Sequence, residues 1–168
     1  MRLCWIALAC VLSLTALANV PLGNGPPIPA APKLQATGYL LIDATNGEVL
    51  VEQNADQPLP PASLTKMMTA YIAEREIAEG RISFDDKVPV STKAWKTGGS
   101  RMFIREGTQV RLEDLLRGIV IQSGNDASVA VAEYIAGSED VFADVMNQTA
   151  VSLGMTNTQF KNSTGLPQ

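Results

Sequence analysis

The chain has 168 residues, of which 46% are hydrophobic and 18% charged, with a formal net charge of −4 at pH 7. Its length suits one domain or part of one, and its acidity argues against a nucleic-acid partner. The sequence contains no histidine, which excludes a Ser-His-Asp triad and a His-based zinc site. We therefore expect no metal and no cofactor.

Residues 1–18 have the features of a secretory signal peptide. Arg2 is a minimal positive region, residues 3–17 are almost wholly apolar, and Ala16-Leu17-Ala18 is a small-x-small cleavage site. The alternative is a buried helix or an anchor, although the run is short for a membrane span. We expect export to the periplasm and cleavage after Ala18. This leaves a mature chain without cysteine, because Cys4 and Cys10 lie in the removed segment.

Residues 19–36 are rich in Pro and Gly and are predicted to form an extended lead segment. A β-hairpin follows, with strands over residues 38–43 and 48–52. Asn46-Gly47 supplies the turn signal between them. The apolar runs of both strands predict burial against helices.

A helix is predicted from Ser63 to Glu79, after Pro60-Pro61 and before Gly80 at its C′ position. Its apolar residues cover much of the circumference and predict a helix that is buried all round: Leu64, Met67, Met68, Tyr71 and Ile72.

Ser63 and Lys66 are three residues apart on this helix and therefore share a face. A hydroxyl and an amine in that position can act as a nucleophile and its base. Lys66 could act as a base only with a lowered pKa, which burial or a second cation would provide. The alternative is that Ser63 caps the helix and Lys66 is a solvated side chain.

The middle of the chain alternates between short strands and helices. Residues 87–90 are predicted to form a strand, Ser91 to cap the next turn, and residues 96–100 to form a flexible loop. A helix is predicted where apolar residues recur at helical spacing: Leu112, Leu115, Leu116, Ile119 and Val120.

Ser123-Gly124-Asn125 separates this helix from the next one, which we expect Asp126 to cap and Gly137 to end. Ser138 is predicted to cap a third helix, with Glu139 and Asp140 in its first turn and its end near Gly154. Residues 156–160 are predicted to form a short strand, and residues 162–168 a loop.

The order Ser63-Leu64-Thr65-Lys66 and then Ser123-Gly124-Asn125 resembles that of the penicillin-recognising serine enzymes. Residues 61–69 and 119–130 look like the low-molecular-mass penicillin-binding proteins, the serine-type D-alanyl-D-alanine carboxypeptidases. The resemblance covers residues 37–167. It implies an α/β fold of the β-lactamase and D,D-peptidase kind, an antiparallel sheet with a helical lobe. Alone, Ser123-Gly124-Asn125 would be a turn between helices.

This resemblance also implies a role for each motif residue. Ser63 would attack the terminal D-Ala-D-Ala bond of a peptidoglycan stem peptide, or a β-lactam, while Lys66 takes its proton. Ser123 would relay a proton toward the leaving amine. Asn125 would bind the substrate amide and help to hold Lys66. The backbone N–H of Ser63 would form half of the oxyanion hole.

The family has a third motif, Lys-Thr-Gly on an edge strand, which follows the second motif. Lys96-Thr97-Gly98 precedes the second motif and lies in a predicted loop, so we expect it not to be that element. The third motif is expected beyond residue 168. Residues 37–168 would then be the N-terminal part of a catalytic domain, incomplete at the C-terminus and inactive as a fragment.

Membrane contact would come only from a C-terminal tail absent from this sequence, which would place the complete protein at the periphery of the inner membrane. Two alternatives to the carboxypeptidase remain. One is a non-catalytic cell-wall binding protein of the same fold, and the other is a β-lactamase.

Overall fold

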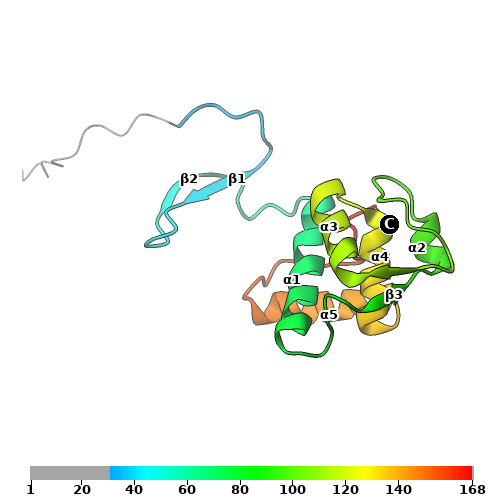
Figure 1. Cartoon of the computed structure of the whole chain (residues 1–168). Coiled ribbons are helices and arrows are strands. Elements are labelled where there is room, and N and C mark those ends of the chain that lie inside the picture. Colours follow the sequence, from blue (N-terminus) through cyan, green and yellow to red (C-terminus); the bar gives the residue numbers. More distant parts are fainter. Residues whose placement is uncertain (1–30, 168) are drawn as a thin grey trace, which may run out of the picture. The chain divides into compact units, whose positions relative to one another are not determined.

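The computed structural model describes residues 31–167 and divides the chain into two compact units, residues 1–55 and 56–168 (Figure 1). The predicted signal peptide, residues 1–18, and the lead segment up to residue 30 lie outside the described residues.

The described part of the first unit contains the predicted hairpin. Strand β1, Tyr39–Ile42, pairs antiparallel with β2, Val49–Gln53, with a register shift between Leu41 and Ile42. The turn is fixed by Asp43, whose side chain accepts a hydrogen bond from Thr45 N at 2.7 Å. Gly47 takes a φ of +76°, the left-handed conformation that glycine adopts readily. The hairpin prediction is therefore confirmed.

Within its own unit, this hairpin does not bury its apolar side chains. Leu40, Leu41 and Leu50 are 54%, 55% and 55% exposed. Among the described residues, β1 and β2 pair with each other and with no further strand. A two-stranded ribbon cannot cover its own faces, so its apolar side chains stay in contact with solvent.

The second unit is a helical lobe in which α4, Asn125–Ala136, packs against four other helices (Figure 1). These are α1, Thr65–Ala78; α2, Thr92–Lys96; α3, Leu112–Gln122; and α5, Glu139–Ser152. Strand β3, Lys87–Pro89, pairs antiparallel with β4, Gln109–Arg111, a strand that the sequence did not predict. No helix in residues 31–167 is long and apolar enough to span a membrane.

Helix ends follow the sequence signals closely. The Ser91 side chain caps α2 by accepting a hydrogen bond from Ala94 N, and the Ser138 side chain caps α5 by accepting one from Val141 N, as predicted. Gly80, Gly137 and Gly154 follow α1, α4 and α5 with positive φ angles. Both caps and all three ends were predicted, because each depends on residues within one helical turn.

Helix α1 differs from its prediction in two respects. It begins at Thr65, and Ser63 lies in a preceding 3₁₀ turn, η1, Ala62–Leu64. The prediction of burial all round the helix is wrong, because Leu64 and Met67 are 68% and 70% exposed. The buried stripe passes through Met68 and Ile72, which pack in a cluster with residues of α4 and α5.

Asp126 does not cap α4, contrary to prediction. Gly124 occupies the N-cap position and Asp126 lies inside the helix. The Asp126 carboxylate accepts hydrogen bonds from Met102 N at 3.0 Å and Ile104 N at 3.1 Å, so it anchors a distant loop.

The strand predicted over residues 156–160 does not form. The Asn147 side chain on α5 accepts a hydrogen bond from Phe160 N and donates one to Phe160 O. These bonds satisfy the backbone groups that a strand partner would otherwise pair with.

Candidate active site

The first motif places an exposed hydroxyl beside a buried amine. Ser63 is exposed in the 3₁₀ turn, whereas Lys66, in the first turn of α1, is only 4% exposed. Lys66 Nζ donates hydrogen bonds to Ser63 Oγ at 3.2 Å and to the Thr164 carbonyl oxygen at 2.9 Å. The two acceptors fix the amine in the position from which it can exchange a proton with Ser63.

Burial lowers the pKa of Lys66 below its ordinary value, and no charged neighbour contributes to the shift. The low-dielectric surroundings disfavour the ammonium form. A larger fraction of neutral amine is therefore present near neutral pH than for an exposed lysine, and a neutral amine can accept a proton from Ser63 Oγ.

The turn that carries Ser63 is closed by a glycine distant in sequence. Ala62 has a φ of +47°, which is rare for a residue with a side chain. Gly165 lies against it with a φ of +80°, and a Cβ atom at Gly165 would come within 1.8 Å of Ala62 O. Only glycine fits at position 165 without displacing the backbone beside Ser63.

The loop that contains Gly165 is held by its own asparagine. Asn162 is buried, and its Oδ1 atom accepts hydrogen bonds from Thr164 N at 3.1 Å and from Gly165 N at 2.7 Å. Its Nδ2 atom donates to Leu166 O at 2.9 Å. This turn fixes the direction of the Thr164 carbonyl that accepts from Lys66.

The second motif lies at the junction of α3 and α4. Ser123 ends α3 in the left-handed conformation with a φ of +53°. Its Oγ atom is buried and has no hydrogen-bond partner among residues 31–167. A buried hydroxyl without a partner is uncommon, which marks Ser123 as a candidate for function.

Asn125 is held by the loop that precedes β4. The residue is 3% exposed, and its Nδ2 atom donates to Gly98 O at 2.7 Å while its backbone N–H donates to Ser100 O at 2.8 Å. Gly99, with a φ of +78°, approaches so closely that a Cβ atom there would lie 2.6 Å from Asn125 Nδ2.

The structure joins Ser63 and Lys66 directly by a hydrogen bond and places Ser123 and Asn125 in the same helical lobe. Among residues 31–167 it shows no hydrogen bond between Asn125 and Lys66, which the resemblance implied. The Thr164 carbonyl takes that place. Sequence reasoning missed Thr164 and Gly165, although the glycine of Ser-Thr-Gly-Leu-Pro signals a turn.

Lys96-Thr97-Gly98 does not lie at a sheet edge. Lys96 is the last residue of α2, and Thr97 and Gly98 continue into the loop that receives Asn125. The prediction of a loop was therefore wrong for Lys96 alone, which is helical.

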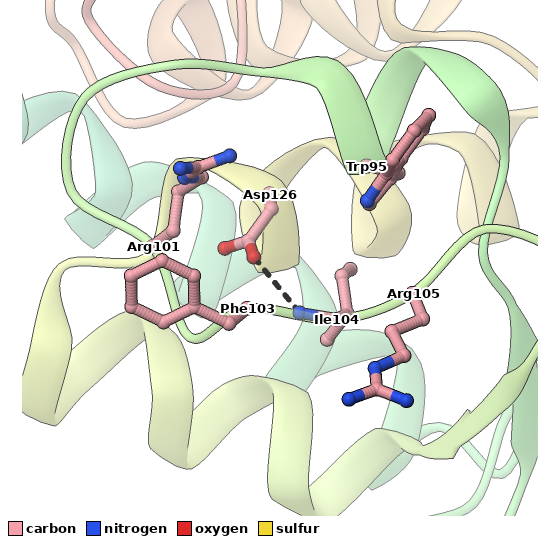
Figure 2. A pocket seen from close by; sticks show the side chains of 6 residues that line it. All are labelled: Trp95, Arg101, Phe103, Ile104, Arg105 and Asp126. Atoms are coloured by element: carbon pink, nitrogen blue, oxygen red, sulfur yellow. Dashed lines mark hydrogen bonds between the residues drawn. The ribbon is translucent and has the colours of Figure 1, made fainter.

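A separate pocket of about 280 Å³ is formed by α2, the start of α4 and the loop between α2 and β4 (Figure 2). It is lined by Trp95, Arg101, Phe103, Ile104, Arg105 and Asp126. The Arg101 guanidinium lies over the Phe103 ring, 5.0 Å from its centre. None of the four predicted site residues lines this pocket. Residues 31–167 contain no group of acidic or thiol side chains suited to hold a metal ion.

Comparison with known proteins gives a consistent result. A family profile described as D-alanyl-D-alanine carboxypeptidase matches residues 26–168. D-alanyl-D-alanine carboxypeptidase DacA of Escherichia coli (strain K12) is 46% identical over 145 residues, which are 83% of this chain and 36% of that protein.

Solved structures are similar over the same region. That of D-alanyl-D-alanine carboxypeptidase DacD from Francisella tularensis matches with a TM-score of 0.80 and 45% identity, over 84% of this chain and 34% of that one. Penicillin-binding protein D2 from Listeria monocytogenes, in its ampicillin-bound form, matches with a TM-score of 0.71 and 30% identity, over 82% and 56%. The chain spans about a third of the length of relatives such as DacA.

Proposed function

The chain belongs to the D-alanyl-D-alanine carboxypeptidase family, and from that premise we propose that the complete gene product is a serine D,D-carboxypeptidase. It removes the terminal D-Ala from peptidoglycan stem peptides and is acylated by β-lactams. The observation that carries this proposal is the buried Lys66 amine, 3.2 Å from the exposed Ser63 hydroxyl. The ampicillin complex of the Listeria relative supports the β-lactam part.

In the proposed reaction Ser63 is the nucleophile and Lys66 its general base. Lys66 Nζ, in its neutral form, takes the proton from Ser63 Oγ as that oxygen attacks the carbonyl carbon of the D-Ala-D-Ala bond. The backbone N–H of Ser63 forms one side of the oxyanion hole. Collapse of the tetrahedral intermediate breaks the C–N bond and leaves an acyl-enzyme, which water hydrolyses.

The second motif supplies the leaving-group side of the reaction. Ser123 Oγ relays to the amine of the departing D-Ala the proton that Lys66 took from Ser63, so that Ser123 keeps its hydroxyl and Lys66 is neutral again. Asn125 Oδ1 accepts a hydrogen bond from the substrate amide, while its Nδ2 remains bonded to Gly98 O. The rigid placement of Asn125 supports this role, because a binding group that is already oriented loses little entropy when substrate arrives.

Two assays on the complete gene product test the proposal. A fluorescent penicillin is expected to label Ser63, located by peptide mapping, and free D-Ala is expected from a peptide that ends in D-Ala-D-Ala. Ser63→Ala serves as the matched control and is expected to show neither.

The same assays separate the alternatives. A label on Ser123 would overturn the assignment of the nucleophile. A non-catalytic wall-binding protein would give no label and no D-Ala, and a β-lactamase would release hydrolysed penicillin rapidly without releasing D-Ala.

Export is a further part of the proposal, and it rests on the sequence of residues 1–18. Cleavage after Ala18 produces a periplasmic protein whose intact mass begins at Asn19. Any contact of the complete protein with the inner membrane comes from a tail outside residues 1–168. Replacing Ala16 and Ala18 together by Gln is expected to block cleavage, because the cleavage site requires small side chains. A secreted mature protein that retains Met1 would contradict this proposal.

A further inference from the structure

Two backbone carbonyl groups hold the buried side chains of the two motifs. Thr164 O accepts from Lys66 Nζ at 2.9 Å, and Gly98 O accepts from Asn125 Nδ2 at 2.7 Å. Because a carbonyl oxygen is part of the backbone, its position is only as fixed as that of the chain segment around it. The groups that fix these two segments therefore control the geometry of the site.

Glu139, at the start of α5, fixes the first of these segments. Its side chain is buried, with 7% of the residue exposed. Glu139 Oε1 accepts hydrogen bonds from Ser163 N at 3.1 Å and from Ser163 Oγ at 2.7 Å. On the opposite side, Thr69 Oγ1 donates to Ser163 O at 2.8 Å. Ser163 is thus bound from two helices, one residue before the carbonyl that receives Lys66.

The second oxygen of Glu139 reaches the helix that leads to the other segment. Lys93 Nζ on α2 lies 2.9 Å from Glu139 Oε2. Helix α2 ends at Lys96, and Gly98 follows two residues later. One carboxylate therefore connects the loop that receives Lys66 with the helix that carries the loop receiving Asn125.

The charge state of Glu139 suits this bridging position. Burial raises the pKa of Glu139, but the hydrogen bonds from Lys93 and from Ser163 outweigh burial and hold the pKa below its ordinary value. Conversely, the hydrogen bond to Glu139 raises the pKa of Lys93. Both groups are therefore charged at neutral pH, and charge-assisted hydrogen bonds are the stronger and shorter ones.

A role in helix α5 alone does not explain this arrangement. An acidic residue in the first turn interacts favourably with the helix dipole without being buried. Exposed Asp140 already provides such a charge in the same turn. Ser138 caps the helix. Burial of Glu139 and its bonds to Ser163 and Lys93 add nothing to the helix start and instead connect the two loops.

We propose that Glu139 is a positioning residue that, through Ser163 and Lys93, sets the Thr164 carbonyl against Lys66 and the Gly98 carbonyl against Asn125. This inference rests on the proposed function, because it assigns Lys66 the role of base. Removing the bridge misplaces the base relative to Ser63 and slows acylation. It does not remove a group that touches the β-lactam.

The test separates binding of penicillin from the acylation step by rapid-quench kinetics on the complete gene product. Glu139→Ala is expected to lower the acylation rate constant by about 10- to 100-fold, the cost of a misplaced reacting group, with a much smaller rise in the dissociation constant of penicillin, because the support of Asn125 is weakened as well. Glu139→Gln is expected to recover part of that loss, because its amide oxygen still accepts from Ser163 while the ion pair with Lys93 is lost. Asp140→Ala, the matched control, is expected to leave both constants unchanged.

The other possible outcomes would overturn the inference about Glu139, the proposed function, or both. An unchanged acylation rate in folded Glu139→Ala would overturn the inference while wild-type labelling at Ser63 upholds the proposed function. A Glu139→Gln rate no higher than that of Glu139→Ala would also overturn it. If Glu139→Ala does not fold, Ser163→Ala replaces it, because this variant loses the Oγ bond to Glu139 but keeps the backbone bond. We expect its acylation rate constant to fall a few fold. A wild-type rate constant in Ser163→Ala would overturn the inference. Absence of labelling in the wild-type protein would overturn the proposed function and this inference with it.

Discussion

The Ser63–Lys66 half of the candidate site and the Ser123–Asn125 half are built in the same way but carry different chemistry. Each half contains a buried polar side chain held by a loop carbonyl: Lys66 by Thr164 O and Asn125 by Gly98 O. The first half joins Ser63 and Lys66, the proposed nucleophile and base, by a direct hydrogen bond. In the second half, the buried Ser123 hydroxyl has no partner among residues 31–167.

The two halves therefore differ in what they contribute to the proposed reaction. In the proposed function the first half carries the reactive pair, and its geometry depends on the 3₁₀ turn η1 and on the first turn of α1, which follows it directly. In the same proposal the second half orients groups toward the substrate, and its geometry depends on the loop that contains Gly98. Substitutions in the first half should therefore act on the rate of chemistry, whereas those in the second should act on chemistry and on binding together.

The largest expected effect comes from Lys66→Ala in the complete gene product. Acylation by penicillin is expected to fall by about 10²–10⁴-fold, the usual cost of losing a general base, because the sequence offers no histidine to replace it. Circular dichroism should show an intact fold. Near-normal acylation at neutral pH would refute the role of Lys66. The first half would then contain no general base to distinguish it from the second.

Glycine substitutions compare the packing of the two halves. Gly165→Ala drives a Cβ atom into the backbone at Ala62, whereas Gly99→Ala meets a side-chain atom, Asn125 Nδ2, whose displacement would strain one hydrogen bond and no backbone. Gly165→Ala is expected to cost roughly 2–5 kcal/mol, left-handed strain plus overpacking, and Gly99→Ala less.

Gly137→Ala is the matched control for this series. Gly137 has a φ of +80° but nothing within 4 Å of an added Cβ atom, so its substitution measures left-handed strain alone. The midpoints of thermal unfolding should rise in the order Gly165→Ala, Gly99→Ala, Gly137→Ala. Equal midpoints for all three variants would show that close packing at Gly165 contributes nothing.

Acid titration tests the carboxylate between the two halves. The folded-state pKa of Glu139 is lowered from its ordinary value of 4.5. Its contribution to stability is therefore fully present above that value and is lost as pH falls through the lower, folded-state pKa. Below about pH 4.5, the stability of Glu139→Gln should fall less with pH than that of the wild type, as measured by urea unfolding. Asp140→Asn, which replaces an exposed carboxylate in the same turn, is the control for removal of a surface charge.

The sequence predicted the parts of this structure that depend on neighbouring residues. Both serine caps, the glycines that end α1, α4 and α5, and the Asn-Gly hairpin turn each need a signal within a few residues. The fold class and the family followed from two motifs in the right order.

What the sequence did not predict depends on distant partners. The Thr164 carbonyl reaches Lys66 across 98 residues of chain, and a backbone oxygen has no side-chain signature. Asp126 is of a residue type that often caps helices, but its carboxylate instead accepts hydrogen bonds from Met102 N and Ile104 N in a distant loop. The hairpin has apolar runs typical of a buried sheet, yet its leucines are exposed. In each case the deciding fact is a tertiary contact or its absence among the described residues.

The smallest expected effect comes from Lys96→Ala, within the sequence Lys-Thr-Gly that a motif search would assign to the family's third element. Lys96 is exposed at the end of α2, and Thr97 N and Oγ1 both donate to Lys93 O. The segment is therefore folded onto a helix end and has no strand edge that could pair with an extended substrate. Acylation by penicillin is expected to stay within about twofold of the wild-type rate, since an exposed side chain here touches none of the motif residues.

Gly98→Ala sharpens this prediction. An added Cβ atom at Gly98 meets nothing within 4 Å, and the carbonyl that accepts from Asn125 is kept. If the segment acts through its backbone, as we infer, Gly98→Ala and Lys96→Ala should both be nearly silent while Asn125→Ala is not. Loss of acylation in Lys96→Ala would instead mean that its amine belongs to the site. The first half would then contain a second cation, and Lys66 would owe its lowered pKa to charge as well as to burial.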